Sequence, residues 1–291
     1  MQMLTETGHL VFVNQTGGWL TGPALEKALV GADGVIAGTE AFTAEVLAAA
    51  PRLKVISRVG VGTDSIDLQA AAARGIRVCT TIRAPVQAVA EHTMSLLLAV
   101  AKGIVSYDRN MHMGDFSVSP GMLLAGKRAG IIGAGRIGRR VGELLEAFGC
   151  TVLYYDPADP SCLSPAWIRC KKLPDLLQEA EILTIHASPP SDGKPILMKK
   201  EFQTCKTGVI LINTARGGLV SEDDLILALQ EGRVGAAGLD VFSLEPYRGP
   251  LLGFPQVIMT PHVASNTIES RTEMEMEAVQ NLISAFRGME P

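Results

Sequence analysis

Strong net charge, long apolar runs and a basic leader are all missing from this sequence. The formal charge is only −4 at pH 7, which gives no electrostatic reason to bind nucleic acid or an anionic membrane. The longest apolar run, residues 94–101, is far too short to cross a bilayer, and no basic stretch followed by an apolar one opens the chain. We therefore expect a cytoplasmic protein that binds any anionic substrate through local groups.

Cysteine and metal-binding patterns are sparse as well. The cysteines form no C-x-x-C pair and are odd in number, so we expect free thiols in a reducing compartment. His9, His92 and His112 have no partner at a metal-ligand spacing, so we interpret them as structural or exposed and expect no metal site. The five cysteines are Cys79, Cys150, Cys162, Cys170 and Cys205.

Short apolar runs alternate with helical patterns in the first 80 residues. The runs predict strands at residues 9–14, 34–38, 53–59 and 76–80. Alternation of this kind is typical of βαβ units and of a parallel sheet. We therefore predict a first α/β domain, although residues 1–8 resemble the end of a helix and no strand precedes them.

A second sheet is predicted further along the chain. Six apolar runs with helical patterns between them match the doubly wound dinucleotide-binding fold. The runs lie at residues 129–133, 151–155, 182–187, 208–213, 236–241 and 257–260.

Two helical patterns flank this second sheet. Residues 86–113 form either a connector helix that also packs against a partner subunit or a plain core helix. Residues 269–287 follow the sixth strand, so we expect this helix to return to the first domain. The sequence therefore predicts a discontinuous domain of residues 1–80 with 268–291, and a second domain of residues 81–267.

Three glycines follow the first strand of the second sheet and open directly into a helix. In the fingerprint G-x-G-x-x-G, Gly133 permits a sharp turn, Gly135 lets a pyrophosphate approach the backbone, and Gly138 lets helix and strand pack closely. The free amides near Arg136 and Ile137 would face the phosphates. This pattern predicts a dinucleotide site.

A carboxylate at the end of the next strand supports that interpretation. Asp156 lies eighteen residues after Gly138, where the fingerprint places a partner for the adenosine ribose hydroxyls. No arginine follows at once to receive a 2′-phosphate, so NAD is favoured over NADP.

Polar residues lie just after several predicted strands, where ligands collect in open α/β sheets. Arg216 follows the strand that leads to Thr214, Asp240 lies late in the next strand, and His262 follows the last strand, with Glu245 in the loop between. Singly, each suits an ordinary surface or strand-end role.

Together these residues suit one reaction. Arginine can bind a carboxylate and polarise a carbonyl, histidine can transfer a proton, and a carboxylate can fix the histidine tautomer. With NAD, the set indicates hydride transfer to or from a 2-hydroxy or 2-keto acid. His186 ends a strand at the same edge, and we expect it to form a wall of the nicotinamide pocket.

The first domain has a second glycine turn. Residues 58–62 end a predicted strand with two glycines, whose amides could bind a carboxylate. On these residues alone, an ordinary strand-to-helix turn is the simpler interpretation.

Six stretches resemble the NAD-dependent D-2-hydroxyacid dehydrogenases and cover nearly the whole chain. They are ISRVGVGTDSID (56–67), AVAEHTMSLLLAVAK (88–102), AGIIGAGRIGRRV (129–141), INTARGGLV (212–220), AAGLDVFSLEP (236–246) and TPHVASNT (260–267). The resemblance implies two doubly wound parallel-sheet domains, a Rossmann NAD domain and a smaller flavodoxin-like substrate domain. It also implies a homodimer formed through the helical arm at residues 86–113.

The resemblance assigns roles to individual residues. It implies that Arg216 binds the substrate's carboxylate and carbonyl, that Glu245 supports the histidine, and that His262 is the acid/base. It implies that the amides of Val61 and Gly62 bind the substrate carboxylate. The cofactor contacts it implies include Asp240, at the nicotinamide carboxamide, and Thr214.

Within the family, the sequence looks most like short relatives of phosphoglycerate dehydrogenase, and glyoxylate or hydroxypyruvate reductases are almost as close. A non-catalytic, corepressor-like NAD-binding protein is the alternative of another class. Family members normally carry a strand and a helix ahead of the segment at His9. We therefore expect the substrate domain to lack its first strand, which would weaken it or leave the protein inactive.

Overall fold

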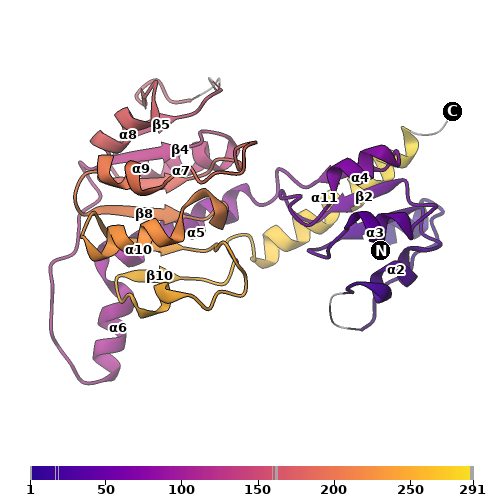
Figure 1. The fold of residues 1–291 in the computed structure, drawn as a ribbon, viewed down its shortest axis with the longest axis horizontal. Helices are drawn as coiled ribbons and strands as arrows, with labels where there is room; N and C mark the ends of the chain where they lie inside the picture. The colour runs from indigo at the N-terminus through magenta and orange to yellow at the C-terminus, as the bar shows by residue number, and fades with distance from the viewer. Residues whose placement is uncertain (1, 17, 19, 159, 161–162, 289–291) are drawn as a thin grey trace. The chain divides into compact units, whose positions relative to one another are not determined.

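Two separate parallel sheets organise the chain (Figure 1). The structure is a computed structural model that describes residues 2–16, 18, 20–158, 160 and 163–288. The chain divides into a small unit, residues 1–85 with 266–291, and a large unit, residues 86–265. Both predicted sheets are confirmed, and the fold class is α/β.

The large unit is built on a seven-stranded sheet in which every neighbouring pair is parallel. Its strand order is β10-β9-β8-β7-β4-β5-β6, so the direction of winding reverses between β4 and β7. Such a reversal is the point at which open α/β sheets bind ligands, at the carboxyl ends of the strands. The strands are β4 Arg128–Ile132, β5 Thr151–Tyr155, β6 Ile168–Arg169, β7 Ile182–Ile185, β8 Val209–Asn213, β9 Val234–Leu239 and β10 Val257–Met259.

Helices cover both faces of this sheet. Every residue of β7 and β8 is buried, which is why these strands are continuous apolar runs in the sequence. One core cluster joins the sheet to α5 and α7, and the other joins it to α8, α9 and α10. The helices are α5 Val86–Lys102, α6 Ile104–His112, α7 Arg136–Ala147, α8 Leu173–Glu179, α9 Lys199–Thr204 and α10 Glu222–Gln230, with 3-10 turns η1 Gly217–Leu219 and η2 Pro250–Gly253.

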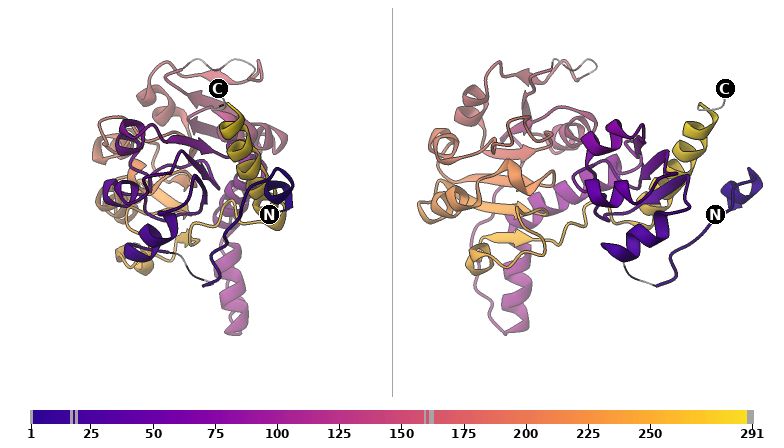
Figure 2. Two further views of the ribbon diagram at one scale, coloured as in Figure 1. Left: turned by 90° about the vertical axis from the view of Figure 1, so that its right-hand side faces the viewer. Right: turned by 45° about the vertical axis from the view of Figure 1, so that its right-hand side comes forward.

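The small unit has a three-stranded parallel sheet in the order β1-β2-β3, shown from two further directions in Figure 2. One face packs on α2, α3 and α4, and the other on α1 and α11. Ser57 of β2 donates its hydroxyl to the Ala278 carbonyl of α11 at 2.8 Å. The elements are α1 Gln2–Glu6, α2 Pro23–Leu29, β1 Gly34–Ala37, α3 Ala44–Ala48, β2 Val55–Arg58, α4 Leu68–Ala73, β3 Arg77–Thr80 and α11 Ile268–Arg287.

The strand predicted at residues 9–14 is wrong. These residues carry no helix or strand, and Leu10 and Phe12 are 83% and 86% exposed. Val11 packs against the cluster under α11, and the ring of His9 lies tilted against that of Phe286, with the centroids 5.5 Å apart. The segment is an apolar run, but none of the described strands pairs with it, and an apolar run alone does not make a sheet.

The single helix predicted at residues 86–113 is also wrong, because Gly103 divides it. Gly103 takes a left-handed φ of 65°, and α5 and α6 meet there at 61°. No single helix among the described residues is long and apolar enough to span a membrane; only this bent pair, taken together, has the length and composition. The sequence also missed β6, whose two residues are both exposed, and the short helix α9.

Candidate active site

At two positions of the glycine turn after β4, the neighbouring backbone leaves no room for a side chain. Gly133 has a φ of 91°, and a Cβ there would lie 2.6 Å from the Ala187 nitrogen beyond β7. A Cβ on Gly138 would lie 2.0 Å from the Gly133 carbonyl oxygen. These two glycines therefore bring the start of α7 against the ends of β4 and β7.

Gly135 differs because open space surrounds it. Nothing lies within 4 Å of a Cβ built there, and no side chain caps α7, whose first residues are Arg136 and Ile137. The uncapped amides carry the positive end of the helix dipole. This donor set fits the pyrophosphate of a dinucleotide.

Asp156 follows β5 and is tied to the same turn. Its Oδ2 accepts the Ala134 amide at 2.8 Å, and its Oδ1 accepts the Ala158 amide at 2.9 Å. A carboxylate beside the glycine turn is the group that suits a ribose hydroxyl.

His186 lies directly after β7, and it is a neutral side chain. Its Nε2 is 2.8 Å from Thr184 Oγ1. Burial lowers the pKa of His186 to about 3, because a charged imidazolium would lose its hydration there. His186 is therefore suited to a wall of the site and unsuited to proton transfer near neutral pH.

Backbone hydrogen bonds hold together the segments that follow β8, β9 and β10. The Asp240 amide donates to the Asn213 carbonyl at 2.9 Å, and the Thr260 amide donates to the Leu239 carbonyl at 2.9 Å. The structure thus brings the residues after three neighbouring strands to one edge of the sheet, as the sequence predicted.

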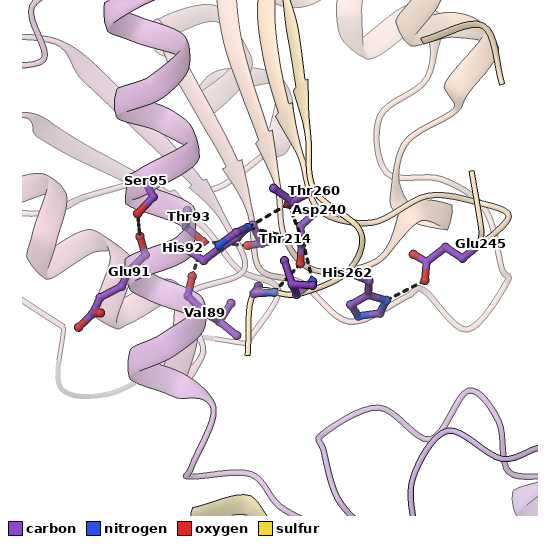
Figure 3. A network of polar contacts seen from close by, with 12 residues as sticks. Val89, Glu91, His92, Thr93, Ser95, Thr214, Asp240, Glu245, Thr260 and His262 are labelled. Atoms are coloured by element: carbon purple, nitrogen blue, oxygen red, sulfur yellow. Dashed lines mark hydrogen bonds and ion pairs between the residues drawn. The ribbon is translucent and has the colours of Figure 1, made fainter. Parts of the chain in front are cut away.

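His262 and Glu245 form a hydrogen-bonded pair at this edge (Figure 3). His262 Nδ1 lies 2.8 Å from Glu245 Oε2, and the two side chains are 50% and 37% exposed. Glu245 Oε1 also accepts the Phe242 amide at 3.1 Å. Since the carboxylate accepts at Nδ1, that nitrogen carries a proton and Nε2 is available for acid–base chemistry.

Arg216 is half-buried, and its segment packs against the segment that carries Glu245. The Asn213 side-chain amide donates to the Arg216 carbonyl at 2.9 Å, which fixes the turn after β8. A Cβ on Gly217 would lie 1.9 Å from the Phe242 carbonyl carbon. Arg216 therefore directly precedes Gly217, which packs closely against Phe242. The amide of Phe242 in turn donates a hydrogen bond to Glu245.

Asp240 is fully buried, and both of its oxygens accept hydrogen bonds. The donors are the Thr260 hydroxyl at 2.5 Å and the Val263 and Ala264 amides at 2.9 Å each. Burial pushes the pKa of Asp240 up, but its contacts with His92, Thr260 and the two amides lower it overall. All the hydrogen bonds of this carboxylate are internal; its contact with a nicotinamide stays a prediction.

Two neighbouring residues of α5 complete the network, and the sequence did not reveal their roles. His92 Nε2 lies 2.9 Å from Thr260 Oγ1 and 3.5 Å from Asp240 Oδ1. Thr93 Oγ1 lies 2.8 Å from the hydroxyl of Thr214. Their partners are more than one hundred positions away in the chain, so no local pattern could have indicated them.

Val61 and Gly62 lie in the small unit, in the turn after β2. The Gly60 amide donates to the Thr81 hydroxyl at 2.7 Å, and the Thr81 amide donates to the Gly60 carbonyl at 3.0 Å. Val61 is 45% exposed. The turn is thus fixed at Gly60, and its next residues reach the surface.

The described cysteines are free thiols. They are Cys79, Cys150, Cys170 and Cys205, and burial raises the pKa of Cys205 to about 12; Cys162 lies outside the described residues. Within the described part of the chain, no group of three or more His, Cys, Asp or Glu side chains could hold a metal ion.

Comparison with known proteins gives one family. Residues 94–264 match the model of the D-isomer specific 2-hydroxyacid dehydrogenase, NAD binding domain. The chain is 37% identical to the D-3-phosphoglycerate dehydrogenase of Mycobacterium tuberculosis over 93% of its own length and 53% of that protein's, so it spans about half of that relative. It is 36% identical to the glyoxylate reductase of Aeropyrum pernix, over 87% of this chain and 79% of the relative.

The fold is also similar to that of a solved structure. The TT0316 protein of Thermus thermophilus superposes with a TM-score of 0.90 at 36% identity, covering 100% of this chain and 94% of that one.

Proposed function

The chain belongs to the D-isomer specific 2-hydroxyacid dehydrogenases, and from that premise we propose that it transfers hydride between NAD and a small 2-hydroxy or 2-keto acid of D configuration. The observation that carries the proposal is the 2.8 Å contact between His262 and Glu245, in a segment that packs against the one carrying Arg216. A histidine with a fixed tautomer, together with an arginine on the neighbouring segment, suits proton transfer to the carbonyl of a substrate whose carboxylate the arginine binds.

The large unit has a donor set that suits NAD. The open amides after Gly135, at Arg136 and Ile137, would hold the pyrophosphate, and Asp156 the adenosine ribose. His186, Thr214 and Asp240 are the proposed residues on the nicotinamide side, although the full burial of Asp240 favours an indirect role. When bound, NAD supplies the acceptor for the hydride.

His262 is the proposed acid/base. In the oxidation direction its Nε2 takes the hydroxyl proton from the substrate, and in reduction it returns that proton. Glu245 accepts from Nδ1 at 2.8 Å and so keeps Nε2 as the nitrogen that exchanges the proton with the substrate.

One arginine and two backbone amides are the proposed hydrogen-bond donors to the substrate. Arg216 would bind the carboxylate through two parallel hydrogen bonds and polarise the adjacent carbonyl. In the small unit, the amides of Val61 and Gly62 are the further proposed donors, supported by the fixed turn at Gly60. The enzyme names of the relatives imply acids that differ in the group attached to carbon two. The candidates to compare are therefore 3-phosphoglycerate, hydroxypyruvate and glyoxylate.

A homodimer is the proposed assembly, through α6 and the residues that follow it. Helix α6 has no buried residue, and apolar side chains are exposed along it and after it. An apolar surface of this kind marks an interaction site. The residues are Ile104, Val105, Met111, Met113, Phe116, Val118 and Leu123.

Free thiols at the four described cysteines support a reducing, cytoplasmic location.

The proposal is tested by turnover of phosphohydroxypyruvate, hydroxypyruvate, glyoxylate and pyruvate with NADH. We expect one of them to be reduced, and His262→Asn to lower kcat by about 10²–10⁴-fold. Asparagine tolerates the left-handed backbone at this position, where φ is 54°, so the fold should persist. Arg216→Gln should reduce kcat/KM strongly as well.

NADH fluorescence provides the control, since both variants should bind NADH as the wild type does. Binding of NADH without turnover of any keto acid would favour the corepressor-like alternative. Turnover that survives both substitutions would exclude the assigned roles.

A further inference from the structure

The turn that carries His262 has an unusual backbone, and Asp240 holds it in place. His262 is the only described non-glycine residue with a positive φ, at 54°. Its amide donates to the Asp240 carbonyl at 2.8 Å, and the next two amides donate to the Asp240 carboxylate. A left-handed conformation persists at such a residue only where its surroundings fix it. Asp240 therefore fixes the turn through both its backbone and its side chain.

His92 contacts Thr260, the residue whose hydroxyl group donates to Asp240 (Figure 3). Thr260 has one hydroxyl proton, and the 2.5 Å contact with Asp240 Oδ1 uses it, because an ionised carboxylate only accepts. Thr260 Oγ1 must then accept from His92 Nε2, which lies 2.9 Å away. The hydrogen bonds thus run in one direction, from the His92 ring through the Thr260 hydroxyl to the Asp240 carboxylate.

The neighbouring residue of α5 makes an equivalent contact on the next segment. Thr93 donates its hydroxyl proton to the Val89 carbonyl at 2.7 Å, so the Thr214 hydroxyl at 2.8 Å donates to Thr93. Thr260 and Thr214 each lie two residues before a proposed active-site residue, His262 and Arg216. Consecutive side chains of one helix thereby hold both post-strand segments.

We infer that His92, with Thr93, is a positioning residue: α5 sets the separation of His262 and Arg216 through Thr260–Asp240 and through Thr214. The catalytic meaning of this assignment rests on the proposed function. A packing role alone would be served by an apolar ring, whereas the geometry gives His92 a donor contact and leaves its side chain only 22% exposed.

The test compares His92→Phe with His92→Gln, whose amide can still donate to Thr260. Ser95→Ala is the matched control, because Ser95 lies exposed on the same helix and donates its hydroxyl to the Glu91 carbonyl of that helix. The readouts are kcat and KM for the best keto acid, the Kd for NADH, and amide hydrogen exchange at Val263 and Ala264.

We expect His92→Phe to lower kcat and to speed exchange at both amides, each by about tenfold, the effect of one lost hydrogen bond. The Kd for NADH should change by less than about twofold, since the glycine turn is untouched. His92→Gln should recover part of both effects, and the control should show neither. A folded His92→Phe protein with unchanged kcat and unchanged exchange would overturn the inference.

Two further variants keep the test decisive. If His92→Phe does not fold, Thr260→Val breaks the same chain of hydrogen bonds while His92 stays, and the same acceleration of exchange is expected. The double variant should be no worse than the more severe single one, because both act on one route; additive losses would contradict the inference. If the wild type reduces no keto acid, the proposed function fails, and the exchange rates still decide the positioning role.

Discussion

The large unit and the small unit differ in how fully their sheets are covered. The large unit has seven strands with helices on both faces, and β7 and β8 are buried at every residue. The small unit has three strands, and most residues of β1 and β3 are only half-buried. Leu10 and Phe12, in the segment before α2, are exposed. His262 and Glu245, whose side chains are 2.8 Å apart, belong to the unit with the more fully buried strands. A well-packed support suits side chains that must be held at a fixed distance.

The two units also differ in sequence continuity. Residues 86–265 form the large unit as one stretch, whereas the small unit needs both ends of the chain. Each unit has its own buried clusters, so each is expected to unfold as its own cooperative transition.

The largest expected effect comes from matched core deletions in the two sheets. Ile56 of β2 and Ile212 of β8 are both completely buried, so Ile56→Ala and Ile212→Ala should each cost about 2–5 kcal/mol of the free energy of unfolding. Each substitution should lower only the transition of its own unit. Hydrogen-exchange mass spectrometry of peptides from β2 and β8 during denaturant titration would measure this. Equal shifts of both transitions by either variant would show that the units unfold as one.

A smaller effect is expected on the free energy of unfolding of the large unit when the pH is lowered. The pKa of His186 falls from 6.5 to about 3 on folding, so between those values the unfolded chain binds a proton that the folded one does not. The free energy of unfolding of the large unit should therefore fall as the pH falls below about 6.5, and His186→Gln should flatten this dependence. Denaturant titrations between pH 4.5 and 7 would measure it, with His112→Gln as the exposed control. A slope unchanged by His186→Gln would contradict the assignment.

The smallest effect is expected at the exposed segment of the small unit. Phe12→Ser should change the free energy of unfolding by less than about 0.5 kcal/mol, because the ring is 86% exposed. Val11→Ser is the matched comparison and should cost more, since Val11 packs against the cluster under α11. Thermal melting of the two variants would measure both. A large loss on Phe12→Ser would mean that something covers this segment in solution.

The sequence predicted the parallel sheets well because buried strands are continuous apolar runs. The runs at residues 182–187 and 208–213 correspond to β7 and β8, and the glycine spacing located the start of α7. The residues after β8, β9 and β10 could be grouped from the topology alone, since carboxyl ends of parallel strands share one edge.

Other features depend on contacts that the sequence does not encode locally. Residues 9–14 have the apolar run of a strand, but pairing needs a partner strand, which is a tertiary property. The bend at Gly103 depends on one left-handed residue inside a helical pattern. His92 looked like an ordinary helix residue because its partner, Thr260, is 168 positions away.

Helix α11 gives the chain an order of events during synthesis. Val279 and Leu282 pack with Leu4 and Val55, so the N-terminal sheet lacks one of its covering layers until α11 leaves the ribosome. The large unit is contiguous and leaves earlier, so it can fold while residues 1–85 still wait. Residues 1–85 are thus translated before the large unit but completed after it, and a stop codon just before residue 268 would remove α11 from the face of the sheet that it covers.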